Sequence, residues 1–233
     1  MAERGRQLTL DLPHRPALGR EDFLVSASNA TAVALVDQWP TWPSYGAIIV
    51  GPPGSGKSHL LEVWREKSQG QFCISESLTI EAIPSLLAGG PLAIEIVAAV
   101  PLPERAIFHA LNLAKQENRS LLFTAERPVS EWALTIPDLS SRLKSLPTVL
   151  IGQPDDALLR GVLVKLFHDR QIEVDEATLS YMLLRMPRSL QSARKIVGGI
   201  DQQALIEKAE ITRAFVARIL AGFTSPDLFE TDT

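Results

Sequence analysis

The sequence predicts an α/β fold: a five-stranded parallel sheet with helices on both faces, followed by a small C-terminal α-helical lid. Three observations favour this fold. Short apolar runs alternate with segments of helical spacing up to about residue 153. Residues 51–58 read Gly-Pro-Pro-Gly-Ser-Gly-Lys-Ser, a complete phosphate-binding loop between a strand-like run and a helix-like segment. From Asp155 onward no segment has the pattern of a strand.

Composition limits the classes of function. With 45% hydrophobic residues the chain can bury a core, while its net charge of −4 gives no broad basic surface for nucleic acid. The single cysteine, Cys73, excludes disulfide bonds within the chain and favours a reducing compartment. No apolar stretch reaches about 18 residues, and the N-terminus lacks the apolar core of a signal peptide. We therefore expect a cytoplasmic protein without a membrane partner.

The first elements follow a flexible N-terminal arm, which we place at residues 1–20. The arm contains one alternating apolar stretch, Gln7-Leu8-Thr9-Leu10-Asp11-Leu12, closed by Pro13. The ordered domain begins near Phe23. Ser28 or Asn29 is a candidate N-cap for a helix over residues 30–39.

The remaining elements of the core alternate as a parallel sheet requires. Apolar runs predict strands, and apolar residues at helical spacing predict helices between them. The segment 80–87 is ambiguous. The expected strands are residues 46–50, 72–74, 92–96, 120–125 and 148–151, and the expected helices of this part begin at His59 and Glu104.

The C-terminal part is expected to be helical throughout. Asp175 is a plausible N-cap, and apolar residues follow it on one helix face. The expected helices cover residues 156–171, 175–186, 189–198 and 212–222. The predicted organisation is therefore an arm (1–20), an α/β nucleotide-binding core (21–153), a helical lid (154–223) and a disordered tail (224–233).

The phosphate-binding loop predicts a nucleotide site. Its glycines let the backbone approach phosphate oxygens, and the N–H groups at the following helix N-terminus attract negative charge. Lys57 would neutralise the β- and γ-phosphates, and the Ser58 hydroxyl would ligate Mg²⁺. Glu95, at the end of an apolar strand, is the candidate acid for the Mg²⁺ shell; the alternative is a solvent-exposed charge at a strand end. The next residue, Ile96, cannot activate water, so intrinsic hydrolysis is in doubt.

Three further residues have two readings each. Thr124 ends a strand and could polarise the attacking water or sense the γ-phosphate, or it could simply be a β-branched strand residue. Arg142 could reach a γ-phosphate on a neighbouring molecule as an arginine finger, or it could be a surface arginine. Arg188, which opens a helix, could fold the lid over the phosphates, or it could be a surface arginine.

Together these segments resemble the AAA+ ATPases of the bacterial replication-initiator clade, over about residues 20–222. Residues 51–58 match the Walker A motif, and residues 92–95 resemble Walker B with Glu in place of the usual Asp. Residues 121–124 are similar to the sensor 1 strand, residues 137–143 to the arginine-finger box, and residues 186–190 to sensor 2. The order and spacing of these segments carry the resemblance.

The resemblance implies the roles of individual residues. Thr124 is the expected sensor 1 residue, and Arg142 is the expected arginine finger, acting in trans. Ser58 and Glu95 would hold Mg²⁺. The entry segment around residue 23 would line the adenine pocket. The implied adenine-nucleotide site (ADP or ATP) comprises Gly51, Pro52, Pro53, Gly54, Ser55, Gly56, Lys57, Ser58, His59, Phe23, Leu24, Val25, Asn29 and Arg188.

The N-terminal stretch selects a branch within the clade. Gln7, Leu8, Leu10 and Leu12 resemble the peptide that docks on the β subunit of DNA polymerase III, the sliding clamp. The alternative is a short arm that packs on its own domain. The chain ends about one helix after the lid, so we do not expect sequence-specific DNA binding through a helix-turn-helix domain.

A clamp peptide before an initiator-like module resembles the Hda family, regulatory inactivators of the initiator DnaA. The resemblance implies a negative regulator of chromosomal replication in the bacterial cytoplasm, at the nucleoid and replisome, with the clamp and DnaA as partners and a homodimer as a possibility. The regulator would stimulate hydrolysis of initiator-bound ATP and have weak or no ATPase activity of its own. The alternatives are an autonomous, DNA-stimulated ATPase of helicase-loader or initiator type, and a purely structural nucleotide-binding adaptor.

Overall fold

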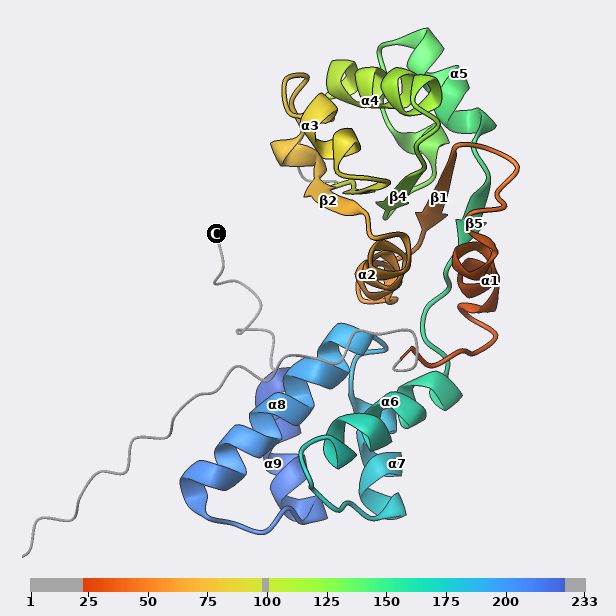
Figure 1. Cartoon of the computed structure of the whole chain (residues 1–233). Helices are drawn as coiled ribbons and strands as arrows, with labels where there is room; N and C mark the ends of the chain where they lie inside the picture. The colour runs from red at the N-terminus through yellow and green to blue at the C-terminus, as the bar shows by residue number, and fades with distance from the viewer. Residues whose placement is uncertain (1–22, 98–100, 225–233) are drawn as a thin grey trace, which may run out of the picture.

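The structure, a computed structural model, describes residues 23–97 and 101–224. Its centre is a five-stranded sheet in the order β2-β3-β4-β1-β5, and all four pairings are parallel (Figure 1). The predicted five-stranded parallel sheet is therefore confirmed. The strands are β1 (Gly46–Val50), β2 (Gln71–Ile74), β3 (Leu92–Glu95), β4 (Leu121–Ala125) and β5 (Thr148–Leu150).

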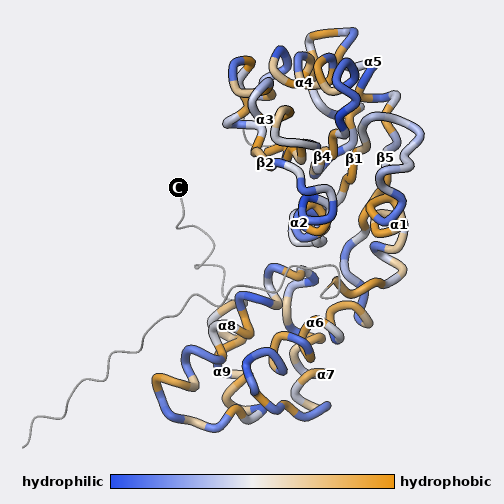
Figure 2. Tube along the Cα trace, in the orientation of Figure 1, coloured by the Kyte–Doolittle hydropathy of each residue, from blue (hydrophilic) through white to orange (hydrophobic). Residues whose placement is uncertain are grey.

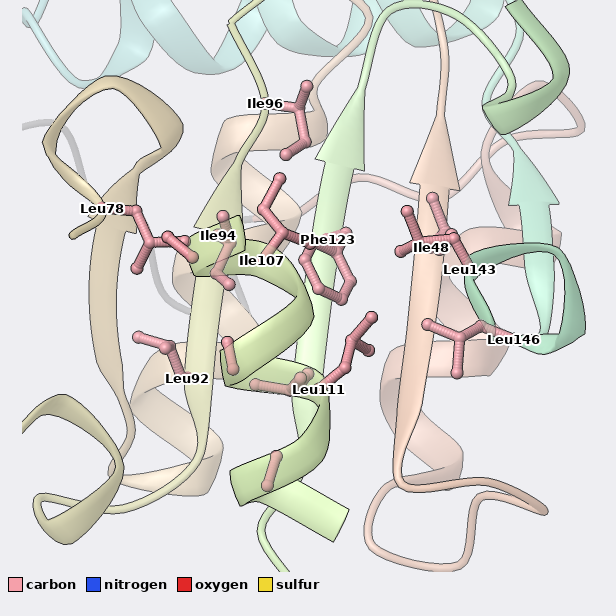
Figure 3. Close-up of a cluster of buried hydrophobic side chains, with 14 of the residues drawn as sticks. Ile48, Leu78, Leu92, Ile94, Ile96, Ile107, Leu111, Phe123, Leu143 and Leu146 are labelled. Carbon is pink, nitrogen blue, oxygen red and sulfur yellow. The ribbon is translucent and has the colours of Figure 1, made fainter. Parts of the chain in front are cut away.

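Helices cover both faces of this sheet. Successive residues of a strand point to opposite faces, so each buried strand contributes side chains to two cores. Ile48 and Phe123 face a core shared with α3 (Ile83–Ala88), α4 (Glu104–Gln116) and α5 (Pro137–Ser145). Figure 3 shows the side chains of Ile107 and Leu111 from α4 packed beside Phe123 of the sheet. Ala47 and Ile49 of the same strand face the other core, shared with α1 (Ala30–Gln38) and α2 (Lys57–Ser68). Short 3₁₀ turns lie at Ser75–Ser77 and Val129–Glu131.

The lid consists of α6 (Asp156–His168), α7 (Glu176–Arg185), α8 (Leu190–Glu207) and α9 (Arg213–Thr224). These helices enclose a third apolar core of their own, below the sheet layers in Figure 1. Figure 2 shows hydrophobic residues on the helix faces that meet in the lid, and hydrophilic residues elsewhere on the same helices. Side chains at Asp155, Asp175 and Ser189 accept hydrogen bonds from backbone N–H groups and so cap α6, α7 and α8. No helix among the described residues is long and apolar enough to cross a bilayer.

Several boundaries differ from the sequence prediction for physical reasons. The ambiguous segment forms α3, and the predicted arginine-finger box forms the helix α5, which begins with proline at its first position. The helix α8 continues nine residues beyond Gly198, its predicted end. Gly199 lies under α9, since a Cβ there would stand 2.9 Å from Phe223 Cζ. The glycine thus permits close helix packing and does not end the helix.

Candidate functional site

The phosphate-binding loop joins β1 to α2 and has the backbone conformation that its glycines predict. Gly54 and Gly56 have φ angles of +70° and +104°, in the left-handed region that other residues rarely adopt. A Cβ on Gly51 would stand 2.6 Å from the backbone oxygen of Ile151. The loop is therefore closed at its base by the neighbouring strand and opens at the N-terminus of α2, where N–H groups favour an anion.

Lys57, the first residue of α2, is only 7% exposed and points back into the loop. Its Nζ donates hydrogen bonds to the backbone oxygens of Gly51 and Pro52, at 2.7 and 2.9 Å. An ammonium group has three N–H donors, so one remains for a ligand. Burial lowers the pKa of Lys57, while the charges of Glu126 and then Glu95 oppose that shift. The ammonium group is thus held in place before any ligand enters.

The candidate Mg²⁺ residues meet across two elements. Ser58 Oγ donates a hydrogen bond to Glu95 Oε1 at 2.8 Å, which brings the loop serine to the end of β3. Glu95 pairs in register with Thr124 on β4. The Thr124 hydroxyl is fully buried, and no hydrogen-bond partner for it exists among the described residues. Ile96, where a second acid would stand, is packed in the apolar core.

These residues line a cavity of about 390 Å³, within the size range of small-molecule sites. One wall is the phosphate-binding loop with α2, the floor is the ends of β3 and β4, and the other wall is the start of α8. The lining residues that the sequence analysis did not propose are Ile96, Val97, Glu126, Leu190, Gln191 and Arg194. Glu126 follows directly after the predicted sensor strand, so its position along the chain could have suggested it.

The lid contacts the loop directly. The backbone N–H of Leu190, at the start of α8, donates to the backbone oxygen of Gly54 at 2.9 Å. A Cβ on Gly54 would collide with the Ser189 side chain. Arg188, one residue earlier, donates instead to Asp156 Oδ1 on α6 at 2.5 Å and is not among the residues that line the cavity. Its proposed role toward the phosphates stays a prediction.

The entry segment lies beside the same loop. Phe23 is buried and meets the His59 ring edge-on, with the ring centroids 5.0 Å apart. The buried Asn29 side chain donates to the backbone oxygen of Leu24 and accepts from the N–H of Ser26, both at 2.9 Å. Asn29 therefore fixes the shape of this segment. Val25 is 52% exposed between these two anchored residues.

Arg142 lies on α5, away from the cavity and on the face of the sheet that α4 covers. Its Nη1 donates to Asn112 Oδ1 at 2.8 Å, and its Nε donates to Asp138 Oδ2 at 3.1 Å. The guanidinium also stacks on Phe108, 5.0 Å from the ring centroid. The side chain is 33% exposed, and hydrogen bonding to Asp138 raises the pKa of Arg142. Arg142 is thus a fixed, charged group at the surface.

The predicted clamp peptide cannot be placed. Gln7, Leu8, Leu10 and Leu12 lie outside the described residues, as does most of the predicted tail. The described part of the chain also has no cluster of three or more His, Cys, Asp or Glu residues that could hold a metal ion.

Known structures share this architecture. No protein-family model matches the chain. Domain III of the replication initiation protein DnaA from Thermotoga maritima superposes with a TM-score of 0.76 and 18% identity, over 92% of this chain and all of that one. AMPPCP-bound DnaA from Aquifex aeolicus superposes with a TM-score of 0.64 and 17% identity, over 83% of this chain and 66% of that one. The chain therefore has the AAA+ fold of the DnaA type.

A relative found by sequence comparison does not narrow the range of possible functions. An uncharacterized protein of Haemophilus influenzae is 24% identical over 188 residues, which cover 74% of this chain and 80% of the relative. The fold alone does not define the role of the protein, which depends on the residues of the site.

The residues at the site fit an adenine nucleotide with Mg²⁺. Lys57 keeps one donor for a phosphate, and the buried Thr124 hydroxyl has no protein partner among the described residues. One serine hydroxyl and one carboxylate are a sufficient protein contribution for Mg²⁺, which keeps several waters and binds substrate phosphates. Ser58 and Glu95 would be these two ligands.

Proposed function

We propose that the protein is a nucleotide-bound negative regulator of replication initiation, which docks on the sliding clamp and stimulates hydrolysis of initiator-bound ATP. The observation that carries the proposal is the separation of two features. The phosphate-binding loop builds one cavity, while Arg142 lies outside the lining of that cavity, on α5. An arginine in that place cannot serve its own site, but it is available to the site of a second molecule.

The residues of the cavity support a structural use of the nucleotide. Lys57 and the loop N–H groups would hold its phosphates, Ser58 and Glu95 would hold Mg²⁺, and the lid would close from α8. The phosphates of a bound Mg²⁺-nucleotide would offset the positive charge of Lys57, and Mg²⁺ would offset the negative charge of Glu95. Ile96 carries no group that could orient or deprotonate water, which favours slow intrinsic hydrolysis. The nucleotide would then hold the core and the lid together as one unit that docks on the partner.

Arg142 would act on the partner. Phosphoryl transfer develops negative charge on the oxygens around the γ-phosphorus, and a guanidinium donated from a neighbouring molecule stabilises that charge. Arg142 is held by hydrogen bonds to Asn112 and Asp138 and by a cation–π contact with Phe108. Such restraint lowers the entropy lost when the side chain meets a phosphate. The likeness of residues 137–143 to the arginine-finger box of the replication-initiator clade supports the same role.

The test separates docking from stimulation. Arg142→Ala should keep binding of the sliding clamp and lose stimulation of DnaA ATPase by about 10³-fold or more. Lys144→Ala is the matched control, because this exposed cation lies two residues away on the same helix. Replacing Leu8, Leu10 and Leu12 by alanine should abolish clamp pull-down but leave nucleotide binding intact. Clamp binding by that triple variant would contradict the docking part of the proposal.

An autonomous, DNA-stimulated ATPase is the second candidate, favoured by the intact Ser58–Glu95 contact and the buried Thr124 hydroxyl. It requires steady-state turnover by the isolated protein and an increase on adding single-stranded DNA. Tightly bound nucleotide with turnover near zero would exclude it.

Full stimulation of DnaA ATPase by the Arg142→Ala variant would favour a third function, a nucleotide-binding adaptor without an arginine finger.

A further inference from the structure

The helix α8 adds a second cation, besides Lys57, to the cavity at the phosphate-binding loop. Its first turns stand against the phosphate-binding loop (Figure 1), anchored by the hydrogen bond from Leu190 N–H to Gly54. Gln191 and Arg194 are three residues apart on this helix, so they share one face. Both line the cavity together with Leu190. The lid therefore presents a guanidinium on the same wall that it closes.

The charges of the cavity leave Arg194 available for an anion. The fixed acids of the lining are Glu95 and Glu126, and its fixed cations are Lys57 and Arg194. Two carboxylates and two cations cancel, so both cations, together with the Mg²⁺ of the proposed site, would be used to balance the several negative charges of a polyphosphate. Within the described ranges no carboxylate forms an ion pair with Arg194, whereas Arg188 is paired with Asp156 and is not among the residues that line the cavity.

His59 holds the Arg194 side chain at the cavity. Arg194 Nη2 lies 3.3 Å from His59 Nδ1, and because a guanidinium has only donors, the imidazole nitrogen accepts. His59 directly follows Ser58 on α2, so this contact joins the lid to the helix that begins at the phosphate-binding loop. It engages one of the five N–H donors of the guanidinium, which leaves others to face a ligand.

We propose that Arg194 is the phosphate-binding residue of the lid, in place of Arg188. The proposal rests on the proposed nucleotide site. The ligand class is a nucleoside di- or triphosphate, and the contact is a charge-assisted hydrogen bond from the guanidinium to a phosphate oxygen. Arg194 then links nucleotide occupancy to lid position, because the same side chain reaches His59 on the core.

The test compares two arginines of the lid. Arg194→Gln and Arg188→Gln remove the same charge and keep a long polar side chain. Titration with the fluorescent probe mant-ADP should show about tenfold to hundredfold weaker binding for Arg194→Gln and a change within about twofold for Arg188→Gln. The dissociation constant of unlabelled adenosine, obtained from competition with mant-ADP, should be the same for both variants and the unchanged protein, since adenosine carries no phosphate.

The outcomes separate this inference from the site itself. Unchanged mant-ADP affinity in Arg194→Gln, or a greater loss in Arg188→Gln, would overturn the assignment while leaving the nucleotide site standing. A parallel loss of adenosine binding in Arg194→Gln would also overturn it, because the substitution would then act through lid folding. Failure of the unchanged protein to bind mant-ADP would remove the nucleotide site and the inference together.

Discussion

Lys57 is the residue on which the proposed nucleotide binding would depend most directly. Its ammonium group is buried and held by two loop carbonyl oxygens. Lys57→Ala should weaken ADP binding at least about tenfold, because one charge-assisted hydrogen bond to phosphate contributes about 1.5–3 kcal/mol. Isothermal titration calorimetry measures the change. Lys195→Ala, an exposed cation outside the cavity lining, is the control. Equal affinities for the two variants would contradict the proposed site.

The environment of Lys57 also gives a pH dependence. Burial lowers the pKa of this ammonium group, and only its protonated form attracts phosphate. Affinity for ADP should therefore be full at neutral pH and should fall as the pH rises, beginning at a lower pH than an exposed lysine would require. The pH dependence should disappear in Lys57→Ala. A pH profile that is the same in both proteins would assign the titration to another group.

Cys73 is the residue whose chemistry burial suppresses. The thiol is 8% exposed, and burial raises the pKa of Cys73 to about 11. At about pH 8 the native thiol should react with a disulfide reagent far more slowly than the unfolded chain, because only the thiolate is nucleophilic. Stopped-flow absorbance in buffer and in denaturant checks this. Fast reaction in buffer would mean that the edge strand β2 opens readily.

At the scale of single elements, the sequence predicts strands better than helix ends. The buried strands of the sheet read as continuous apolar runs, so their pattern suffices. Gly199, inside α8, packs against Phe223 of the next helix, α9, and no local pattern in the sequence contains this contact. Local patterns are likewise sufficient for only part of the candidate site. The loop residues follow one another in the chain, so the sequence identifies them, whereas Arg194 joins them only because the lid packs where it does.

The adjacent glycines of α8 test this interpretation of the helix. A methyl group added at Gly198 would meet nothing within 4 Å, whereas a Cβ on Gly199 would meet the ring of Phe223. Gly198→Ala should therefore stabilise the protein by about 0.5–1 kcal/mol through helix propensity. Gly199→Ala should stabilise less or destabilise, because the Phe223 ring must move. Denaturant unfolding of both variants measures the difference, and equal gains would mean that α9 does not press on this glycine.

At the scale of the whole molecule, the core and the lid have separate apolar interiors that meet around the phosphate cavity. Three direct links lie at or near this cavity. They are the Leu190–Gly54 hydrogen bond, the contact of Arg194 with His59, and the approach of Leu24 to Gly161, where a Cβ would stand 3.0 Å from Leu24 Cδ1. A ligand that contacts both the loop and α8 adds to these links. Nucleotide should therefore stabilise the arrangement of the two parts as well as each part.

This coupling predicts the thermal behaviour of the protein. ADP with Mg²⁺ at about 100 times its dissociation constant should add about 2.7 kcal/mol of stability and raise Tm, with core and lid unfolding in one transition. Without nucleotide the lid should unfold first, because it then depends mainly on its own small apolar interior. Calorimetry with and without ADP measures both effects, and adenosine alone should give a smaller shift because it cannot engage Lys57. Two separate transitions that persist in saturating ADP would show that the nucleotide binds the core without engaging the lid, and would leave Gln191 and the rest of the α8 wall without a part in binding.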